Sequence, residues 1–225
     1  MSDHTGSLTM KPMPPIDEAR EISRVFDGDR LKLARTCRGW TQRQLADEVD
    51  ELSSAAVSQF EKGGARPSPR TLVRLARELE FPVGFFAHAA GTEIMEAQGF
   101  FRSLRSTPQR ARATALAHAE LVRHFVLVLE RYVQLPSLEI PSGPTDSNTN
   151  LDEIESIADM TREKLAVAPG PLRHAVRLLE VSGAVVTRLA TDDERIDAFS
   201  VPFPDRPVVV LGSDKDNLER SRFDA

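Results

Sequence analysis

The chain contains a single cysteine, Cys37, among its 225 residues. One cysteine excludes an intrachain disulfide and any zinc site built mainly from thiolates. The sequence also has no long apolar run, so neither a membrane-spanning helix nor a signal peptide is predicted, and residues 1–20, with three prolines, are expected to form a flexible tail. We therefore expect a cytoplasmic protein with no membrane partner.

The net charge of −5 is unevenly distributed along the chain. Acidic side chains outnumber basic ones mainly after residue 146, whereas residues 21–90 are close to neutral. A balanced segment does not attract nucleic acid by its bulk charge. Any DNA-binding face must therefore depend on where individual Arg and Lys side chains lie.

Residues 21–90 have the pattern of short helices separated by tight breaks. Apolar residues from Val25 to Ala34 predict a first helix that ends at Gly39, and Thr41 is a predicted N-cap for a helix over residues 42–49. Ser53 or Ser54 caps a third helix, which runs through Lys62 and stops at a glycine pair. A fourth helix over 70–80 and a short fifth over 82–87 complete an expected all-helical domain.

The rest of the chain predicts different modules. Residues 91–135 are expected to hold a connector and a long helix, residues 136–150 a linker, and residues 151–225 a small partial α+β module. Within that module we expect helices over 151–167 and 171–181, and strands over 184–189, 196–202 and 206–211. The predicted fold class is therefore mainly α, with a five-helix N-terminal domain, a long connecting helix and a partial α+β module.

One face of the long helix carries an apolar stripe of large side chains. Its members follow a spacing of four, seven and eleven residues, which places them on one side of a helix: Leu121, Phe125, Val128 and Tyr132. Such a stripe needs to be covered. Two interpretations stay open, dimerisation with a second copy, which we favour, and packing onto the C-terminal module of the same chain.

Three segments near the N-terminus resemble the XRE, or lambda-repressor-like, helix-turn-helix family. They are residues 40–46, residues 57–63 and the pair Pro67-Ser68, and the resemblance spans residues 27–87. It implies a DNA-binding domain in which a second recognition helix enters the major groove. Trp40, Leu45, Val57 and Phe60 are then expected in the core.

The resemblance also assigns DNA contacts by position. Base-reading residues would be those facing the groove: Ser54, Ala55, Ser58 and Gln59. Phosphate contacts would come from Gln42, Arg43, Lys62 and Arg66. Gln59 is the strongest candidate base reader, because an amide can bond two edge atoms of adenine. The turn over residues 50–53 is one residue longer than the common form, which leaves open a shift of the groove-facing assignments by one position.

The second half of the chain resembles the region leading into an ImmA/IrrE-type zinc peptidase domain, which often follows an XRE helix-turn-helix. The resemblance is carried by Phe100 to Ser103 and by residues 183–186, 196–200, 206–211 and 219–225. In that family the last segment leads into His-Glu-x-x-His, which binds zinc. The 225 residues lack this motif, and their five histidines have no Glu partner at the required spacing. We therefore expect no enzyme activity and no cofactor.

The predicted function is a sequence-specific transcriptional regulator that binds a double-stranded DNA operator as a homodimer. The first alternative is an N-terminal fragment of a fused zinc metallopeptidase, whose catalytic motif would lie beyond residue 225. The second is a protein-binding role with a degenerate recognition helix.

Overall fold

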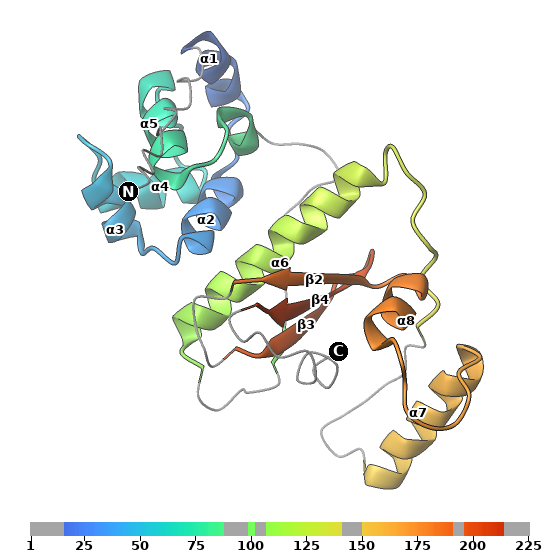
Figure 1. Cartoon of the computed structure of the whole chain (residues 1–225). Coiled ribbons are helices and arrows are strands. Elements are labelled where there is room, and N and C mark those ends of the chain that lie inside the picture. Colours follow the sequence, from blue (N-terminus) through green and yellow to red (C-terminus); the bar gives the residue numbers. More distant parts are fainter. Residues whose placement is uncertain (1–15, 88–98, 102–106, 141–149, 191–195, 214–225) are drawn as a thin grey trace, which may run out of the picture. The chain divides into compact units, whose positions relative to one another are not determined.

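The computed structural model describes residues 16–87, 99–101, 107–140, 150–190 and 196–213. The chain divides into two units, residues 1–94 and residues 95–225 (Figure 1). The first unit holds helices and the second holds helices and a sheet, in agreement with the predicted fold class.

The first unit is built from five α-helices and one 3-10 helix in its described residues. They are α1 (Ile16–Arg24), α2 (Gly28–Cys37), α3 (Gln42–Glu48), α4 (Ser54–Glu61), α5 (Pro69–Leu79) and η1 (Val83–Phe86). Their inward side chains form one apolar cluster in which Leu31, Leu45, Val57, Leu72 and Phe86 are fully buried. This cluster holds α3 and α4 in fixed positions.

Three expectations for this unit need correction. Helix α1 begins at Ile16, inside the range 1–20 that was predicted as a flexible tail, because Ala19 is fully buried in the core and anchors the helix. The apolar pattern from Val25 onward spans a break between two helices, and Val25 itself is exposed. The predicted fifth helix over 82–87 is a single 3-10 turn.

Helix α2 approaches α4 so closely that only glycine fits at the contact. A Cβ on Gly28 would lie 2.3 Å from the Phe60 carbonyl oxygen and 2.7 Å from that of Glu61. The start of α2 therefore packs directly on the backbone at the end of α4. This contact helps to fix the orientation of α4.

Cys37 is buried at the end of α2. Burial raises the pKa of its thiol from 9.0 to about 12, and nearby Arg38 offsets only part of this rise. At pH 9 a thiol with the usual pKa is about half ionised, whereas one with a pKa near 12 is ionised in about one molecule in a thousand.

We therefore expect iodoacetamide to alkylate Cys37 at pH 9 at least about 100-fold more slowly in the folded chain than in urea. The thiolate is the reactive form, and folding suppresses both its formation and its exposure. Intact-mass spectrometry over time measures both rates. Equal rates would show that Cys37 is not in a closed core.

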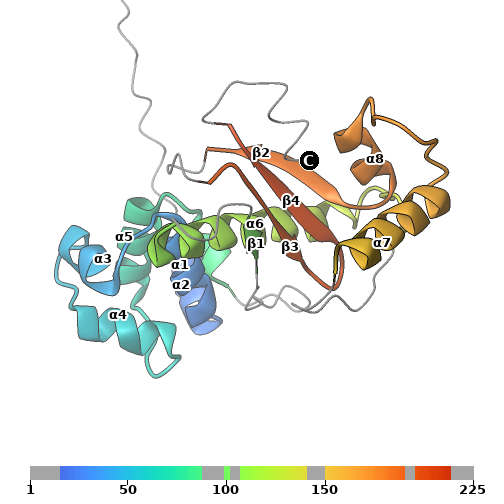
Figure 2. The ribbon, with the colours of Figure 1, turned by 90° about the horizontal axis from the view of Figure 1, so that it is seen from below.

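The second unit contains a mixed sheet with the strand order β1-β3-β4-β2. Its described elements are β1 (Phe100–Phe101), α6 (Gln109–Leu129), α7 (Leu151–Lys164), α8 (Ala175–Val181), β2 (Val185–Leu189), β3 (Ala198–Pro202) and β4 (Pro207–Gly212). Strand β4 pairs antiparallel with β3 and parallel with β2, while β1 pairs antiparallel with β3. Helix α6 covers one face of this sheet (Figure 2).

Helix α6 packs on the sheet through a different face from the one that the stripe predicted. Ala115 and Ala119 are buried against the sheet core, with Val122 half-buried beside them. Small alanine side chains let the helix backbone come close to the strands. The predicted stripe stays outside, where Phe125 is 67% exposed and Tyr132 is 81% exposed. Helix α6 therefore does pack onto the C-terminal module, but this contact leaves the large side chains of the stripe exposed.

The connector and linker ranges also contribute to this unit. β1 lies in the range 91–135 and pairs Phe101 with Phe199 of β3. Ser137, from the predicted linker, lies against Gly183, where a Cβ would be 2.4 Å from the Ser137 carbonyl oxygen. The predicted helix over 171–181 begins only at Ala175. Residues 219–225, which carry part of the peptidase resemblance, lie outside the described residues.

In the described part of the chain, none of the helices is both long and apolar enough to cross a bilayer.

Candidate nucleic-acid interface

Helix α3 begins with a complete capping box. The Thr41 hydroxyl oxygen accepts a hydrogen bond from the Gln44 backbone N–H at 3.1 Å, and the Gln44 side-chain oxygen accepts one from the Thr41 N–H at 3.0 Å. Only two of the first backbone N–H groups of α3 are used in this way, so others at this end stay directed outward. The start of α3 is therefore rigid and suited to an anionic oxygen.

The turn between α3 and α4 is held by an arginine from α5. Glu51 has a positive φ of 61°, and the Arg74 Nη1 donates to the Asp50 carbonyl oxygen and to a Glu51 carboxylate oxygen, both at 3.0 Å. The turn ends at Ser53, whose hydroxyl caps α4 by accepting from the Ala56 N–H. These contacts hold the turn between α3 and α4 in place.

Helix α4 separates its buried and exposed residues clearly. Val57 is fully buried and Phe60 nearly so. Ser54, Ala55 and Gln59 are exposed, and Ser58 is half-buried. The four predicted base-reading residues thus share the outer surface of α4. A shift by one residue in either direction would include Val57 or Phe60, so the exposure pattern favours the unshifted assignment.

A buried ion pair joins α2 and α4 and contacts the segment that precedes α3. The Arg35 guanidinium donates to both Glu61 carboxylate oxygens at 2.6 and 3.0 Å, and its Nη1 donates to the Trp40 carbonyl oxygen at 2.6 Å. The side chains of Arg35 and Glu61 are only 12% and 5% exposed. Paired charges in a buried site fix the geometry of the elements that carry them. The angle between α3 and α4 therefore depends on this pair.

Gln42 belongs to the same network. Its side-chain amide donates to a Glu61 carboxylate oxygen at 2.7 Å, so the predicted phosphate-binding side chain is already oriented by the core. An amide nitrogen carries two hydrogens, and the backbone N–H of Gln42 lies at the first position of α3. Its contact with phosphate stays a prediction, to be made by these remaining donors.

The three basic residues predicted to contact phosphate are all exposed. Arg43 lies on α3, with its guanidinium 3.9 Å from the Asp47 carboxylate, and Lys62 is the C-cap of α4. Arg66 donates to the Arg24 carbonyl oxygen at 2.5 Å, which ties its side chain to the end of α1. Surface exposure makes these side chains accessible to a DNA backbone.

Gln59 lies next to a glycine that leaves room for its side chain. A Cβ on Gly64 would be 2.4 Å from the Gln59 side-chain oxygen, and the Gly64 N–H bonds to the Gln59 backbone oxygen. In the unbound chain the amide therefore folds back over the turn after α4. The predicted contact with a base would require this exposed side chain to rotate away from Gly64.

The geometry of residues 41–66 is that of a capped positioning helix, a turn and an exposed second helix. A family model described as helix-turn-helix matches residues 31–86. The first unit carries an XRE-type helix-turn-helix. This domain supports DNA binding by the protein. Searches of curated proteins and of solved structures found no match.

Sequence reasoning missed two residues that hold the helix-turn-helix in place. Arg35 and Arg74 were not singled out, although each fixes an element of the motif. Arg35 is an arginine on an otherwise apolar helix face, a pattern that indicates a buried partner, whereas the Glu51 partner of Arg74 is exposed and gave no such signal. Among the described residues, no group of three or more His, Cys, Asp and Glu side chains is arranged to hold a metal ion.

Proposed function

We propose that this protein is a sequence-specific transcriptional regulator that binds a double-stranded DNA operator in the cytoplasm. The single observation that carries the proposal is the outer surface of α4, where Ser54, Ala55, Ser58 and Gln59 lie above a buried frame. Short polar and small side chains at these positions let the helix enter the major groove without a steric barrier.

The proposed division of roles follows the chemistry of the side chains. Gln59 bonds the N6 and N7 atoms of an adenine, the serine hydroxyls bond base edges, and Ala55 packs on a thymine methyl group. Arg43, Lys62 and Arg66 contact phosphates together with Gln42, and they contribute affinity without sequence information. The first unit is nearly neutral, so these few local cations and the start of α3 must supply the attraction.

A homodimer is the proposed functional form. One recognition helix reads only a few base pairs, whereas two copies read two half-sites about one DNA turn, roughly 34 Å, apart. The exposed stripe of α6 supports this proposal, because large apolar side chains such as Phe125 and Tyr132 are left uncovered in a single chain.

Selection from a pool of random duplexes tests the proposal. The purified chain is incubated with the pool at two salt concentrations, and the retained DNA is sequenced. We expect enrichment of a two-fold-symmetric site, with affinity that falls steeply as salt rises. Absence of enrichment, or absence of binding at low salt, would contradict sequence-specific regulation.

A second candidate function is that of the N-terminal part of a zinc peptidase fused to the helix-turn-helix. It is supported by the pairing of Phe100 and Phe101 with Ser200 and Phe199, since both segments belong to the ImmA/IrrE resemblance. In this proposal the 225 residues hydrolyse no peptide themselves, because they lack His-Glu-x-x-His.

The intact mass of the protein isolated from its own cells separates the two candidates. A mass of 24.9 kDa favours the regulator without an enzyme part. A larger mass, with His-Glu-x-x-His in peptides that follow Ala225, favours the peptidase fusion.

A further inference from the structure

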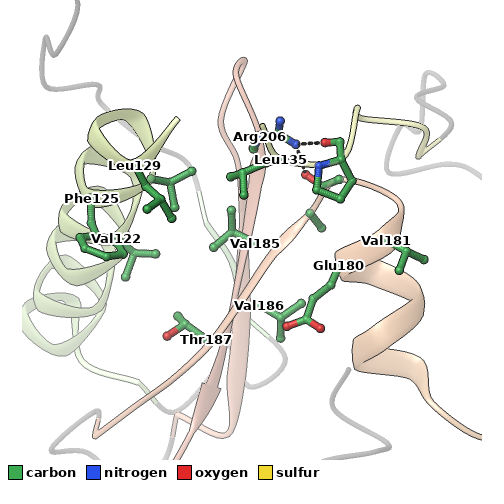
Figure 3. Close-up of a pocket in the computed structure, with 14 residues that line it drawn as sticks. Val122, Phe125, Leu129, Leu135, Glu180, Val181, Val185, Val186, Thr187 and Arg206 are labelled. Atoms are coloured by element: carbon green, nitrogen blue, oxygen red, sulfur yellow. Dashed lines mark hydrogen bonds between the residues drawn. The ribbon is translucent and has the colours of Figure 1, made fainter. Parts of the chain in front are cut away.

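The second unit has an apolar groove along the outer edge of β2. The groove has a volume of about 450 Å³ and lies between α6 and α8. Figure 3 shows Val122, Phe125 and Leu129 on the α6 wall and Val181 and Glu180 on the α8 wall. Strand β2 runs between the two walls.

The floor of the groove is a strand edge without a partner in the described part of the sheet. β2 is the last strand in the order β1-β3-β4-β2, and only its other edge pairs with β4. Side chains of neighbouring strand residues point to opposite faces, and Figure 3 shows Val185 on the α6 side and Val186 on the α8 side. An open edge of this kind offers backbone N–H and C=O groups to another strand.

One end of the groove is closed by a fixed arginine. The Arg206 Nε donates to a Glu130 carboxylate oxygen at 2.6 Å, and its Nη1 donates to the carbonyl oxygens of Pro136 and Gly183. These bonds compensate its charge and use three of its five N–H donors. Arg206 therefore shapes this end of the groove, whose other lining residues are apolar or glycine except for Glu180 and Thr187.

The exposed apolar side chains of α6 continue from this groove. Phe125 lines the groove and is also 67% exposed, and Val128 lies on the same side of the helix. Tyr132, the last member of the predicted stripe, lies in the turn after α6, which ends at Leu129, and is also exposed. The strand edge and the uncovered helix face are thus parts of one surface. A single occupant can therefore cover both.

We propose that this surface is the dimer interface, in which β2 of one protomer pairs antiparallel with β2 of a second copy. This proposal rests on the homodimer proposed above and assigns its contact surface. A two-fold axis perpendicular to the sheet and passing beside Thr187, the middle residue of β2, makes the strand its own partner. The two sheets then form one continuous sheet.

The same two-fold axis accounts for the helix stripe. When two strands pair antiparallel about an axis perpendicular to the sheet, helices that cover the same face come to lie side by side. The α6 helices then cover each other with Phe125 and its neighbours, and their side chains fill the two grooves. An aromatic side chain buries about 150–250 Å². Phe125 and Tyr132 therefore supply only part of the ~800 Å² that each partner contributes to a stable interface, and the exposed Val128, Val181 and the edge of β2 supply further area.

Sedimentation analysis of two matched variants tests the interface. Phe125 on α6 and Phe100 on β1 are both 67% exposed, so glutamate at either position changes the free surface equally. We expect Phe125→Glu to raise the dimer dissociation constant at least about 30-fold, as for loss of a central aromatic contact, and Phe100→Glu to leave it unchanged. A wild-type chain that stays monomeric, or a dimer that Phe125→Glu leaves intact, would overturn the proposal.

A cysteine cross-link tests the strand pairing itself. Opposite residues of an antiparallel pair have Cβ atoms about 4.5–5.5 Å apart, close enough for a disulfide after a small shift. Under mild oxidation Thr187→Cys should give a covalent dimer, whereas Ala113→Cys, at an exposed position of α6, should not. The native Cys37 is buried and adds little background. Failure of the Thr187 variant to cross-link in a dimeric protein would overturn the β2 pairing.

Failure of the interface is distinguishable from failure of the DNA-binding function. A monomeric Phe125→Glu variant still contains the intact helix-turn-helix and is expected to keep its weak binding to a single half-site. A wild-type dimer that binds no DNA would instead contradict the proposed function and leave the interface in place.

Discussion

Replacing Glu61 with alanine is expected to lower the free energy of unfolding of the first unit by about 3–5 kcal/mol. The change removes the carboxylate that accepts two of the three hydrogen bonds of Arg35, so that only the bond to the Trp40 carbonyl oxygen remains. It also removes the acceptor of the Gln42 side-chain amide. Urea unfolding followed by Trp40 fluorescence measures this loss in the free energy of unfolding, because Trp40 is the only tryptophan of the sequence and lies in this unit.

Asp47→Ala serves as the matched control for Glu61→Ala. Asp47 also faces an arginine, but that pair is exposed and its N–O distance is 3.9 Å. Its loss should cost at most about 0.5 kcal/mol. If the two variants lose similar stability, the Arg35–Glu61 pair does not hold the helix-turn-helix together.

Gln59→Ala and Arg43→Ala are expected to affect DNA binding in different ways. Loss of the Gln59 amide should weaken binding to the selected site by about 1–3 kcal/mol, because the contact with one base pair is lost. Binding to random duplexes should stay unchanged. Loss of the Arg43 charge should weaken binding to both kinds of DNA alike and reduce the salt slope by about 1. Fluorescence anisotropy with the selected and random duplexes measures both.

An exposed arginine outside the motif controls for the change in charge. Arg20 lies on α1, where it pairs with Asp17 on the surface. Arg20→Ala should leave binding to either DNA nearly unchanged. Equal losses for Gln59→Ala and Arg43→Ala on both kinds of DNA would refute the division into base reading and phosphate binding.

The parts of the fold that local signals specify could be predicted from the sequence. Thr41 was predicted as a cap and is one, the cap of α4 is Ser53, one of the two serines predicted for it, and Gly39 and Gly63 end helices with positive φ. These residue types act through their own backbone and side-chain geometry, which does not depend on distant contacts. Local chemistry was therefore sufficient to place the helices of the motif.

The features that depend on long-range contacts could not be predicted in the same way. Helix α1 is anchored by Ala19, whose small side chain gives no signal until the core around it is known. The stripe on α6 was correctly seen as apolar, but the face that packs on the sheet is the one carrying Ala115 and Ala119. Large apolar side chains in a sequence predict that a helix face will be buried. The fit between two surfaces decides which face packs on which neighbour.

The candidate site shows the same division. The outward-facing positions of α4 were assigned by the resemblance to the helix-turn-helix family, but the link from Gln42 through Glu61 to Arg35 joins residues far apart in the sequence. The likeness of the motif drew attention to the DNA-contacting residues and not to the arginines that hold them in place.

The most direct test of the central claim is to map where DNA touches the chain. The ¹⁵N-labelled full chain is titrated with a mixed-sequence duplex at low salt, and amide chemical shifts are followed by NMR. We expect the largest changes at the start of α3 and on the outer surface of α4, at Ser54, Ala55, Ser58 and Gln59. Changes centred outside residues 41–66, or none at any DNA concentration, would contradict the assignment of this surface as a DNA reader.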